Sequence, residues 1–191
     1  KTANLYKDIT NAAKFAIQGV DTEKISVSMQ DLQKRRQGVV NQLVAGVGGL
    51  IRSNGVELVN GIATFKDEHI IQVGEKEITA ENFIIATGSS AILPSFIKID
   101  SDKIITSKEA LLLEEIPKSM TVIGGGVIGI EFAYLYSALG SKVTVLELMD
   151  NILPMVDEEI SEMARFRMEK EGIIFNTGAK VTEIKDNLIT F

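Results

Sequence analysis

The 191-residue sequence contains no cysteine and only one histidine, His69. Without cysteine the chain has no disulfide framework, no thiolate metal site and no thiol nucleophile. A single histidine argues against a histidine-based metal site and against a Ser-His-Asp triad. His69 falls at the edge of a predicted hairpin, and we interpret it as a strand-edge residue. We therefore expect no metal site, no thiol nucleophile and no Ser-His-Asp triad in the chain.

The sequence also lacks a strong excess of charge of one sign. It has 20 Lys and Arg residues against 26 Asp and Glu residues, a net charge of −6, and no basic stripe with interleaved aromatic residues. We therefore do not expect a nucleic-acid partner. The first residues show no basic-then-apolar signal pattern, so we expect a cytoplasmic protein. The chain starts without Met, at Lys1, within an apparent helix, and we expect it to be a piece of a longer protein.

One long apolar stretch, residues 120–140, carries a single charge at Glu131. Its length would suffice to cross a bilayer. Four internal glycines and the ionisable glutamate argue against a membrane span. A buried α/β core explains the apolar character, and we expect no membrane partner.

The same stretch contains a glycine motif between a strand and a helix. A β-branched run at 121–123 ends at three consecutive glycines, and a helical pattern runs from Val127 to Leu139. Gly124, Gly126 and Gly129 have the G-x-G-x-x-G spacing of a dinucleotide-binding turn. In that turn the first glycine allows the bend, the second lets a pyrophosphate approach, and the third lets helix and strand pack closely. A glycine turn that only closes a βαβ unit is the alternative.

The residues that follow favour the nucleotide-binding interpretation. A second predicted strand at 142–146 ends in Glu147, 18 positions after Gly129. An acidic residue near that place binds the adenosine ribose in βαβ dinucleotide sites. The helix would also begin with unpaired N–H groups and a positive partial charge that face the phosphates. The sequence therefore predicts an NAD site at this turn.

Periodicity predicts an α/β fold in two parts, residues 1–116 and 117–191, divided near Pro117. The first part begins with two helices and continues with short strands. The second alternates strands and helices, which implies a parallel sheet, and ends in a hairpin-like tail. The predicted elements of the first part are helices 1–19 and 29–52 and strands 56–65, 70–73 and 83–86. Those of the second are strands 120–124, 142–147 and 173–176, helices 127–140 and 157–171, and the tail 179–191.

Four segments resemble the FAD-dependent pyridine-nucleotide disulfide reductases: residues 84–89, 117–133, 139–147 and 152–157. The long helix, followed by Val59-Asn60-Gly61, is similar to the dihydrolipoamide dehydrogenase branch of that family. The resemblance covers essentially the whole chain. It implies that residues 1–116 are the central part of an FAD-binding domain. Residues 117–191 would then be the N-terminal part of a Rossmann-type NAD-binding domain.

The resemblance also implies roles for individual residues. Glu147 would bind the adenosine ribose of NAD, and the backbone of Val181 would lie beside its adenine. Lys1 would pair with Glu131 near the flavin. The remaining residues of the NAD pyrophosphate turn would be Gly124, Gly125, Gly126, Val127, Ile128, Gly129 and Ile130. Contacts to FAD would come from Lys1, Ala63, Thr87, Gly88 and Ser89.

The chain departs from the family pattern in ways that limit what it can do alone. It lacks the glycine turn for FAD, the redox cysteine pair and the C-terminal domain with its His–Glu dyad, which His69 does not match. We expect the chain by itself to be inactive and only to bind nucleotide. In the intact enzyme, the resemblance implies electron transfer from a dithiol through the cysteine pair and FAD to NAD⁺.

The resemblance further implies a homodimer that associates with a 2-oxo-acid dehydrogenase complex. Other interpretations remain open at this stage. The chain could derive from another disulfide or mercuric-ion reductase, or from an NADH oxidase of the same build. An alternative from a different functional class is that the chain is a non-catalytic nucleotide-binding module.

Overall fold

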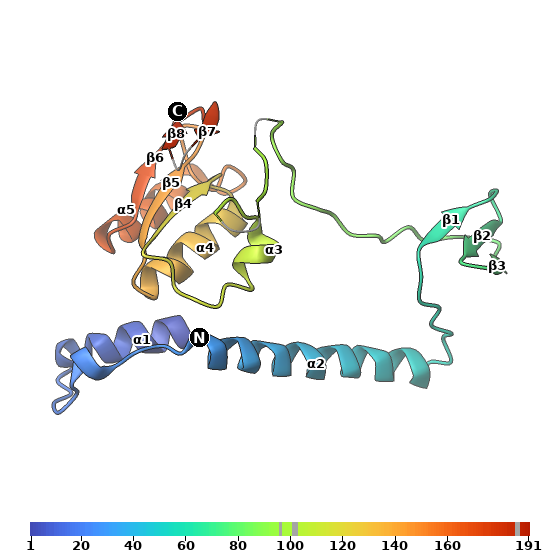
Figure 1. The fold of residues 1–191 in the computed structure, drawn as a ribbon, viewed down its shortest axis with the longest axis horizontal. Helices are drawn as coiled ribbons and strands as arrows, with labels where there is room; N and C mark the ends of the chain where they lie inside the picture. The colour runs from blue at the N-terminus through green and yellow to red at the C-terminus, as the bar shows by residue number, and fades with distance from the viewer. Residues whose placement is uncertain (96, 101–102, 186–187) are drawn as a thin grey trace. The chain divides into compact units, whose positions relative to one another are not determined.

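The structure is a computed structural model that describes residues 1–95, 97–100, 103–185 and 188–191 (Figure 1). The chain divides into two compact units. One contains residues 1–34 and 91–191, and the other contains residues 35–90. The division predicted between residues 116 and 117, near Pro117, concerns the domains of the protein and stays a prediction.

The larger unit contains the predicted parallel sheet, with strand order β4-β5-β6. The α/β prediction is confirmed, and each element of the sheet unit begins and ends within two residues of its predicted bounds. The chain runs through β4 (Ser119–Ile123), α4 (Val127–Ala138), β5 (Lys142–Leu146), α5 (Glu158–Lys170) and β6 (Ile174–Asn176). The tail forms the predicted antiparallel hairpin, β7 (Glu183–Lys185) with β8 (Leu188–Thr190).

The core of this unit lies between α4 and the sheet. Ala133 and Tyr136 of α4 are buried together with Val143 and Val145 of β5. The Tyr136 hydroxyl donates a hydrogen bond of 2.6 Å to the carbonyl oxygen of Ala110, at the end of the short helix α3 (Ser107–Ala110). Burial raises the pKa of the Tyr136 phenol. The tyrosine therefore satisfies its polar end while its ring fills the core.

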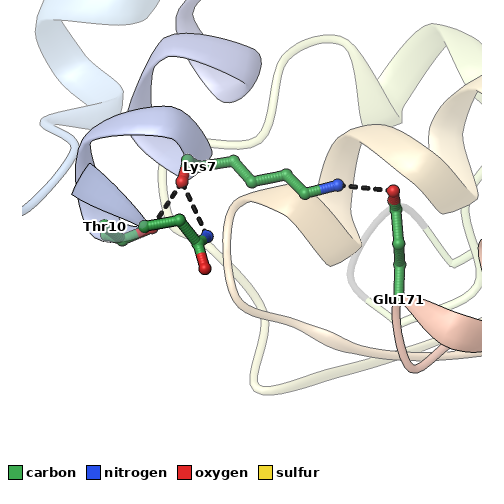
Figure 2. A network of polar contacts seen from close by, with 4 residues as sticks. Lys7, Thr10 and Glu171 are labelled. Carbon is green, nitrogen blue, oxygen red and sulfur yellow. Dashed lines mark hydrogen bonds and ion pairs between the residues drawn. The ribbon is translucent and has the colours of Figure 1, made fainter. Parts of the chain in front are cut away.

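The N-terminal helix α1 (Thr2–Thr10) packs against α4 in the same unit. The Lys7 ammonium lies 2.7 Å from a carboxylate oxygen of Glu171, just after α5 (Figure 2). The main-chain carbonyl of Lys7 accepts a hydrogen bond from the Thr10 hydroxyl (Figure 2). It also accepts one from the Asn11 side chain. These polar groups compete with the next helical turn, so α1 ends well before Gly19.

The predicted helix over 1–19 is therefore too long. After α1 a short 3₁₀ helix, η1 (Ala12–Phe15), ends at Ala16 in the left-handed conformation. A second 3₁₀ turn, η2 (Thr22–Lys24), lies within the connection to α2 (Met29–Ser53). The predicted bounds of α2 are correct to one residue, and the glycine that follows its end, Gly55, has a φ of +67°.

The smaller unit contains an antiparallel meander, β1 (Ala63–Phe65), β2 (Ile70–Val73) and β3 (Lys76–Thr79). β2 has the predicted bounds. The prediction of a strand over 56–65 is wrong for residues 56–62, which form no strand. The main chain turns at Gly61, whose φ is +154°. The strand predicted over 83–86 is not formed. A strand needs a neighbour for its main-chain hydrogen bonds, and the described strands of this unit pair only with one another.

In the part of the chain that the structure describes, no helix is both long and apolar enough to cross a membrane. The apolar stretch at 120–140 instead supplies β4 and α4.

Candidate nucleotide-binding site

The site begins where β4 ends at the glycine motif. Gly124 has a φ of +108°, which few other residues adopt, and its N–H donates to the carbonyl oxygen of Leu146. At Gly129, a Cβ atom would lie 2.1 Å from the carbonyl oxygen of Gly124 and 3.1 Å from a side-chain carbon of Val122. The first turn of α4 therefore packs so closely on the end of β4 that only glycine fits at position 129.

Gly126 differs from Gly129 because nothing lies within 4 Å of the place its Cβ would take. It differs from Gly124 because its φ of −71° is one that any residue adopts. It is the N-cap of α4, and no side chain caps the helix there. Among the described residues, no side chain thus caps the first-turn N–H groups, which carry the positive end of the helix dipole. Open space beside uncapped amides is the arrangement that binds phosphate groups at helix N-termini.

Glu147 follows β5 and lies beside this turn. Its side chain is buried, with 8 % of the residue exposed. One carboxylate oxygen accepts a 2.5 Å hydrogen bond from the N–H of Gly125, and the other accepts a 2.7 Å bond from the N–H of Met149. The Glu147 main chain bonds to Asn176 and Ala179. The carboxylate is therefore fixed at the carboxyl ends of the parallel strands, where ligands bind in open α/β sheets.

The turn and the acidic residue open into one groove of about 2030 Å³ in the larger unit. Val181, whose backbone the sequence analysis placed beside adenine, also lines it, and its side chain is buried. Lys180 is a neighbouring lining residue that the sequence reasoning did not identify, because a lone lysine in a hairpin segment carries no spacing signal. The predicted NAD residues that line the groove are Gly124, Gly126, Val127, Ile128, Gly129, Glu147 and Val181.

Three predicted NAD residues lie elsewhere around the turn. Gly125 is buried behind the groove against Glu147 and Ile152. Ile130 is buried in the core. Glu131 is exposed on α4, and none of the ion pairs among the described residues joins it to Lys1. The flavin-side pair of Lys1 and Glu131 stays a prediction.

Four of the five predicted FAD residues lie in the smaller unit. Ala63 lies in β1, and Thr87, Gly88 and Ser89 lie in an exposed segment outside the helices and strands of the smaller unit. Lys1 belongs to the other unit. Their role toward FAD therefore stays a prediction. Among the described residues, no group of three or more His, Cys, Asp or Glu side chains could hold a metal ion.

Comparison with curated proteins identifies relatives along the whole chain. The chain is 36% identical over 196 residues to the dihydrolipoyl dehydrogenase of Acholeplasma laidlawii, covering 100% of the chain and 57% of that protein. It is 38% identical over 188 residues to a dihydrolipoyl dehydrogenase of Bacillus subtilis (strain 168), covering 96% of the chain and 41% of that protein. The chain thus spans about half the length of these relatives or less.

Solved structures show the same similarity. The HOCl-induced flavoprotein disulfide reductase RclA from Escherichia coli superposes with a TM-score of 0.75 at 26% sequence identity. The match covers 96% of this chain and 41% of that one. A Cu(II) complex of the same reductase gives a TM-score of 0.73 at 27% identity. Residues 3–189 match the family described as pyridine nucleotide-disulphide oxidoreductase. The chain therefore belongs to the pyridine nucleotide-disulphide oxidoreductase family.

Proposed function

We propose that the protein containing this chain is a flavin-dependent dihydrolipoyl dehydrogenase, and that this chain supplies its NAD site. The observation that carries the proposal is the glycine turn, which shares one groove with the buried carboxylate of Glu147. Relatives at 36–40% identity carry the name dihydrolipoyl dehydrogenase or dihydrolipoamide dehydrogenase, which favours this substrate class. The balanced reaction converts a dithiol and NAD⁺ into a disulfide, NADH and one proton.

The described residues support distinct roles toward NAD. The open space at Gly126 and the uncapped start of α4 suit the pyrophosphate. Both oxygens of Glu147 keep lone pairs that can accept hydrogen bonds from ribose hydroxyl groups. The backbone near Val181 would lie along the adenine. These groups bind and orient the nucleotide, and none of them is required to transfer a proton.

FAD is the second cofactor of the proposal. When bound, it would carry electrons between a cysteine pair and the nicotinamide. Lys1, Ala63, Thr87, Gly88 and Ser89 are the residues we assign to it, on the resemblance alone. We also propose that the whole enzyme is a cytoplasmic homodimer that associates with a 2-oxo-acid dehydrogenase complex. A dithiol substrate suits a reducing compartment, which supports the cytoplasmic assignment.

The test is an assay of the whole FAD-loaded protein with dihydrolipoamide and NAD⁺, followed by the appearance of NADH. We expect NADH formation from the whole protein and none from the 191-residue chain, because that chain has no cysteine to exchange electrons with the dithiol. Parallel assays offer NADH with mercuric ion or dioxygen as the acceptor. Turnover with one of these and none with dihydrolipoamide would replace the proposal with a mercuric reductase or an NADH oxidase.

A further inference from the structure

A buried serine on α5 bonds to the loop that follows Glu147. Ser161 is only 2 % exposed, and its hydroxyl donates a 2.5 Å hydrogen bond to the carbonyl oxygen of Ile152. Ile152 is itself 1 % exposed. A hydroxyl in such a site needs an acceptor, and a buried carbonyl needs a donor, so each group satisfies the other. The bond thereby ties α5 to the loop.

The opposite side of the same peptide group bonds to the glycine turn. The N–H of Leu153 belongs to the peptide unit that carries the Ile152 carbonyl, and it donates a 2.7 Å hydrogen bond to the carbonyl oxygen of Gly125. Because the peptide unit is planar, its carbonyl and N–H groups cannot turn independently. Ser161 and Gly125 therefore hold this one peptide from its two sides, and Leu153 is kept in the left-handed conformation at a φ of +51°.

Gly125 connects this peptide to the acidic residue. Its carbonyl oxygen accepts from Leu153 while its own N–H donates to Glu147. Moreover, the space around Gly125 is full: a Cβ atom there would lie 3.1 Å from Glu147 and from Ile152. A rotation of the 152–153 peptide would thus shift Gly125 and, through it, the donor that fixes the carboxylate.

We propose that Ser161 is a positioning residue for nucleotide recognition, which acts through the Ile152–Leu153 peptide and Gly125 to hold the Glu147 carboxylate in place. The inference rests on the proposed NAD site and adds a residue that does not line its groove. Preorganised acceptors bind a ligand more tightly because they lose less conformational entropy on binding. Loss of the Ser161 hydroxyl should therefore weaken the hydrogen bonds between the ribose hydroxyls and the Glu147 carboxylate.

The experiment compares Ser161→Ala with Ser141→Ala in the whole protein. Ser141 is the matched control because its hydroxyl also donates to a main-chain carbonyl, that of Pro117, at 2.6 Å. That bond lies at the amino ends of β4 and β5, whereas Glu147 lies at the carboxyl end of β5. NADH and NADPH are titrated by nucleotide fluorescence, and thermal unfolding is measured for every variant.

We expect both alanine variants to unfold at a lower temperature than the wild type. Only Ser161→Ala should weaken NADH binding, by about fivefold, which corresponds to the loss of one hydrogen bond. NADPH binding should change less, so the preference for NADH should shrink. Ser161→Thr, which keeps the hydroxyl, should restore the preference. Amide hydrogen exchange without nucleotide should rise at residues 149–153 in Ser161→Ala and not in Ser141→Ala.

Equal NADH affinities for the two alanine variants would overturn the positioning role, as would unchanged exchange at residues 149–153. If the wild-type protein binds no NADH, the proposed NAD site itself fails and the role of Ser161 toward a nucleotide fails with it. If the wild type binds NADH and only the Ser161 comparison fails, the NAD site stands and this inference alone is wrong.

Discussion

The main-chain N–H of Gly125 donates a hydrogen bond to the carboxylate of Glu147, which joins the glycine turn to the acidic residue in a single rigid arrangement. Met149 donates to the other carboxylate oxygen. Each oxygen accepts from one donor among the described residues, which leaves lone pairs for a ligand hydroxyl. Gly125, which lies between two of the spaced motif glycines, thus orients the carboxylate that we propose binds the ribose, while the three spaced glycines shape the turn.

The motif glycines should separate into structural and ligand-binding positions. Gly129→Ala should lower the free energy of unfolding by about 2 kcal/mol or more, because its Cβ would collide with the carbonyl of Gly124. Gly126→Ala should lower it by less than about 1 kcal/mol, because that Cβ meets nothing and only the weaker N-cap preference of alanine is lost. It should nevertheless weaken NADH binding about tenfold or more, because the methyl group would occupy the pyrophosphate position. Urea unfolding and NADH titration measure the two effects.

The two variants serve as controls for each other. A loss of stability in Gly126→Ala as large as that in Gly129→Ala would show that position 126 is packed in solution. Unchanged NADH binding in a folded Gly126→Ala protein would show that the pyrophosphate does not bind in the open space beside Gly126.

Tyr136→Phe should destabilise the larger unit and alter its response to alkaline pH. Removal of the hydroxyl leaves the buried carbonyl of Ala110 without this donor, at a cost of about 1–2 kcal/mol. Burial raises the pKa of Tyr136 in the folded state. Its contribution to stability is therefore fully present below the unfolded pKa of about 10 and is lost as pH rises through the raised folded pKa.

Urea unfolding of the wild type and of Tyr136→Phe across this alkaline range gives the measurement. The stability difference between them should narrow above about pH 10. Tyr134→Phe is the control on the same helix, because Tyr134 is only half-buried. A difference that stays constant with pH would show that Tyr136 is not deprotonated on unfolding.

The sequence allowed the sheet unit and its glycine turn to be predicted because both depend on local signals. Apolar periodicity defined β4, α4 and β5, and the family's glycine spacing located the turn. The strand predicted over 83–86 had the same local character, yet Ile84 is 94 % exposed and Ile85 is 73 % exposed. β-Branched residues favour a strand only where a neighbouring strand and a packed face are available.

The network behind Glu147 could not be predicted in the same way. Ser161 bonds to a carbonyl nine positions earlier, a separation with no helical or strand period. In the sequence, Gly125 occupies a variable position of the motif between Gly124 and Gly126. Its contacts with Glu147 and Ile152 arise only once the chain has folded. Polar positioning of this kind depends on tertiary hydrogen bonds, which leave no pattern in one sequence.

The ion pair between Lys7 and Glu171 should couple α1 weakly to the segment after α5. The two side chains are 32 % and 24 % exposed, so solvent screens their attraction, and we expect a coupling energy of at most about 1 kcal/mol. A double-mutant cycle of Lys7→Met and Glu171→Gln measures it through urea unfolding. The coupling should fall as ionic strength rises.

The exposed pair of Lys24 and Asp21 provides the comparison for that cycle. It should give a coupling near zero, because both of its side chains are largely exposed. A coupling for Lys7 and Glu171 no larger than that of this pair would mean that α1 is held by its apolar contacts alone.

The last prediction concerns the choice between NAD and NADP. The Glu147 carboxylate can accept hydrogen bonds from both ribose hydroxyls of NAD but repels the 2′-phosphate of NADP. Residues 148–153 contain no Arg or Lys, and Asp150 adds a second carboxylate. Because like charges in a partly desolvated groove repel, we expect NADH to bind about tenfold more tightly than NADPH, or better. Titration of both nucleotides at matched ionic strength measures the ratio.

Two variants identify the group responsible for this preference. Glu147→Gln removes the repelling charge but keeps a polar side chain, so the NADH-to-NADPH ratio should approach one. Lys180→Ala removes the lysine next to Val181 in the groove, which Lys103 and Lys118 also line. Since the Lys180 cation would attract a phosphate, its loss should leave the preference for NADH intact or increase it. Equal affinities of the wild type for NADH and NADPH would show that Glu147 does not discriminate between the two nucleotides. A preference that persists undiminished in Glu147→Gln would assign the selection to another group, either Asp150 or the backbone of the turn.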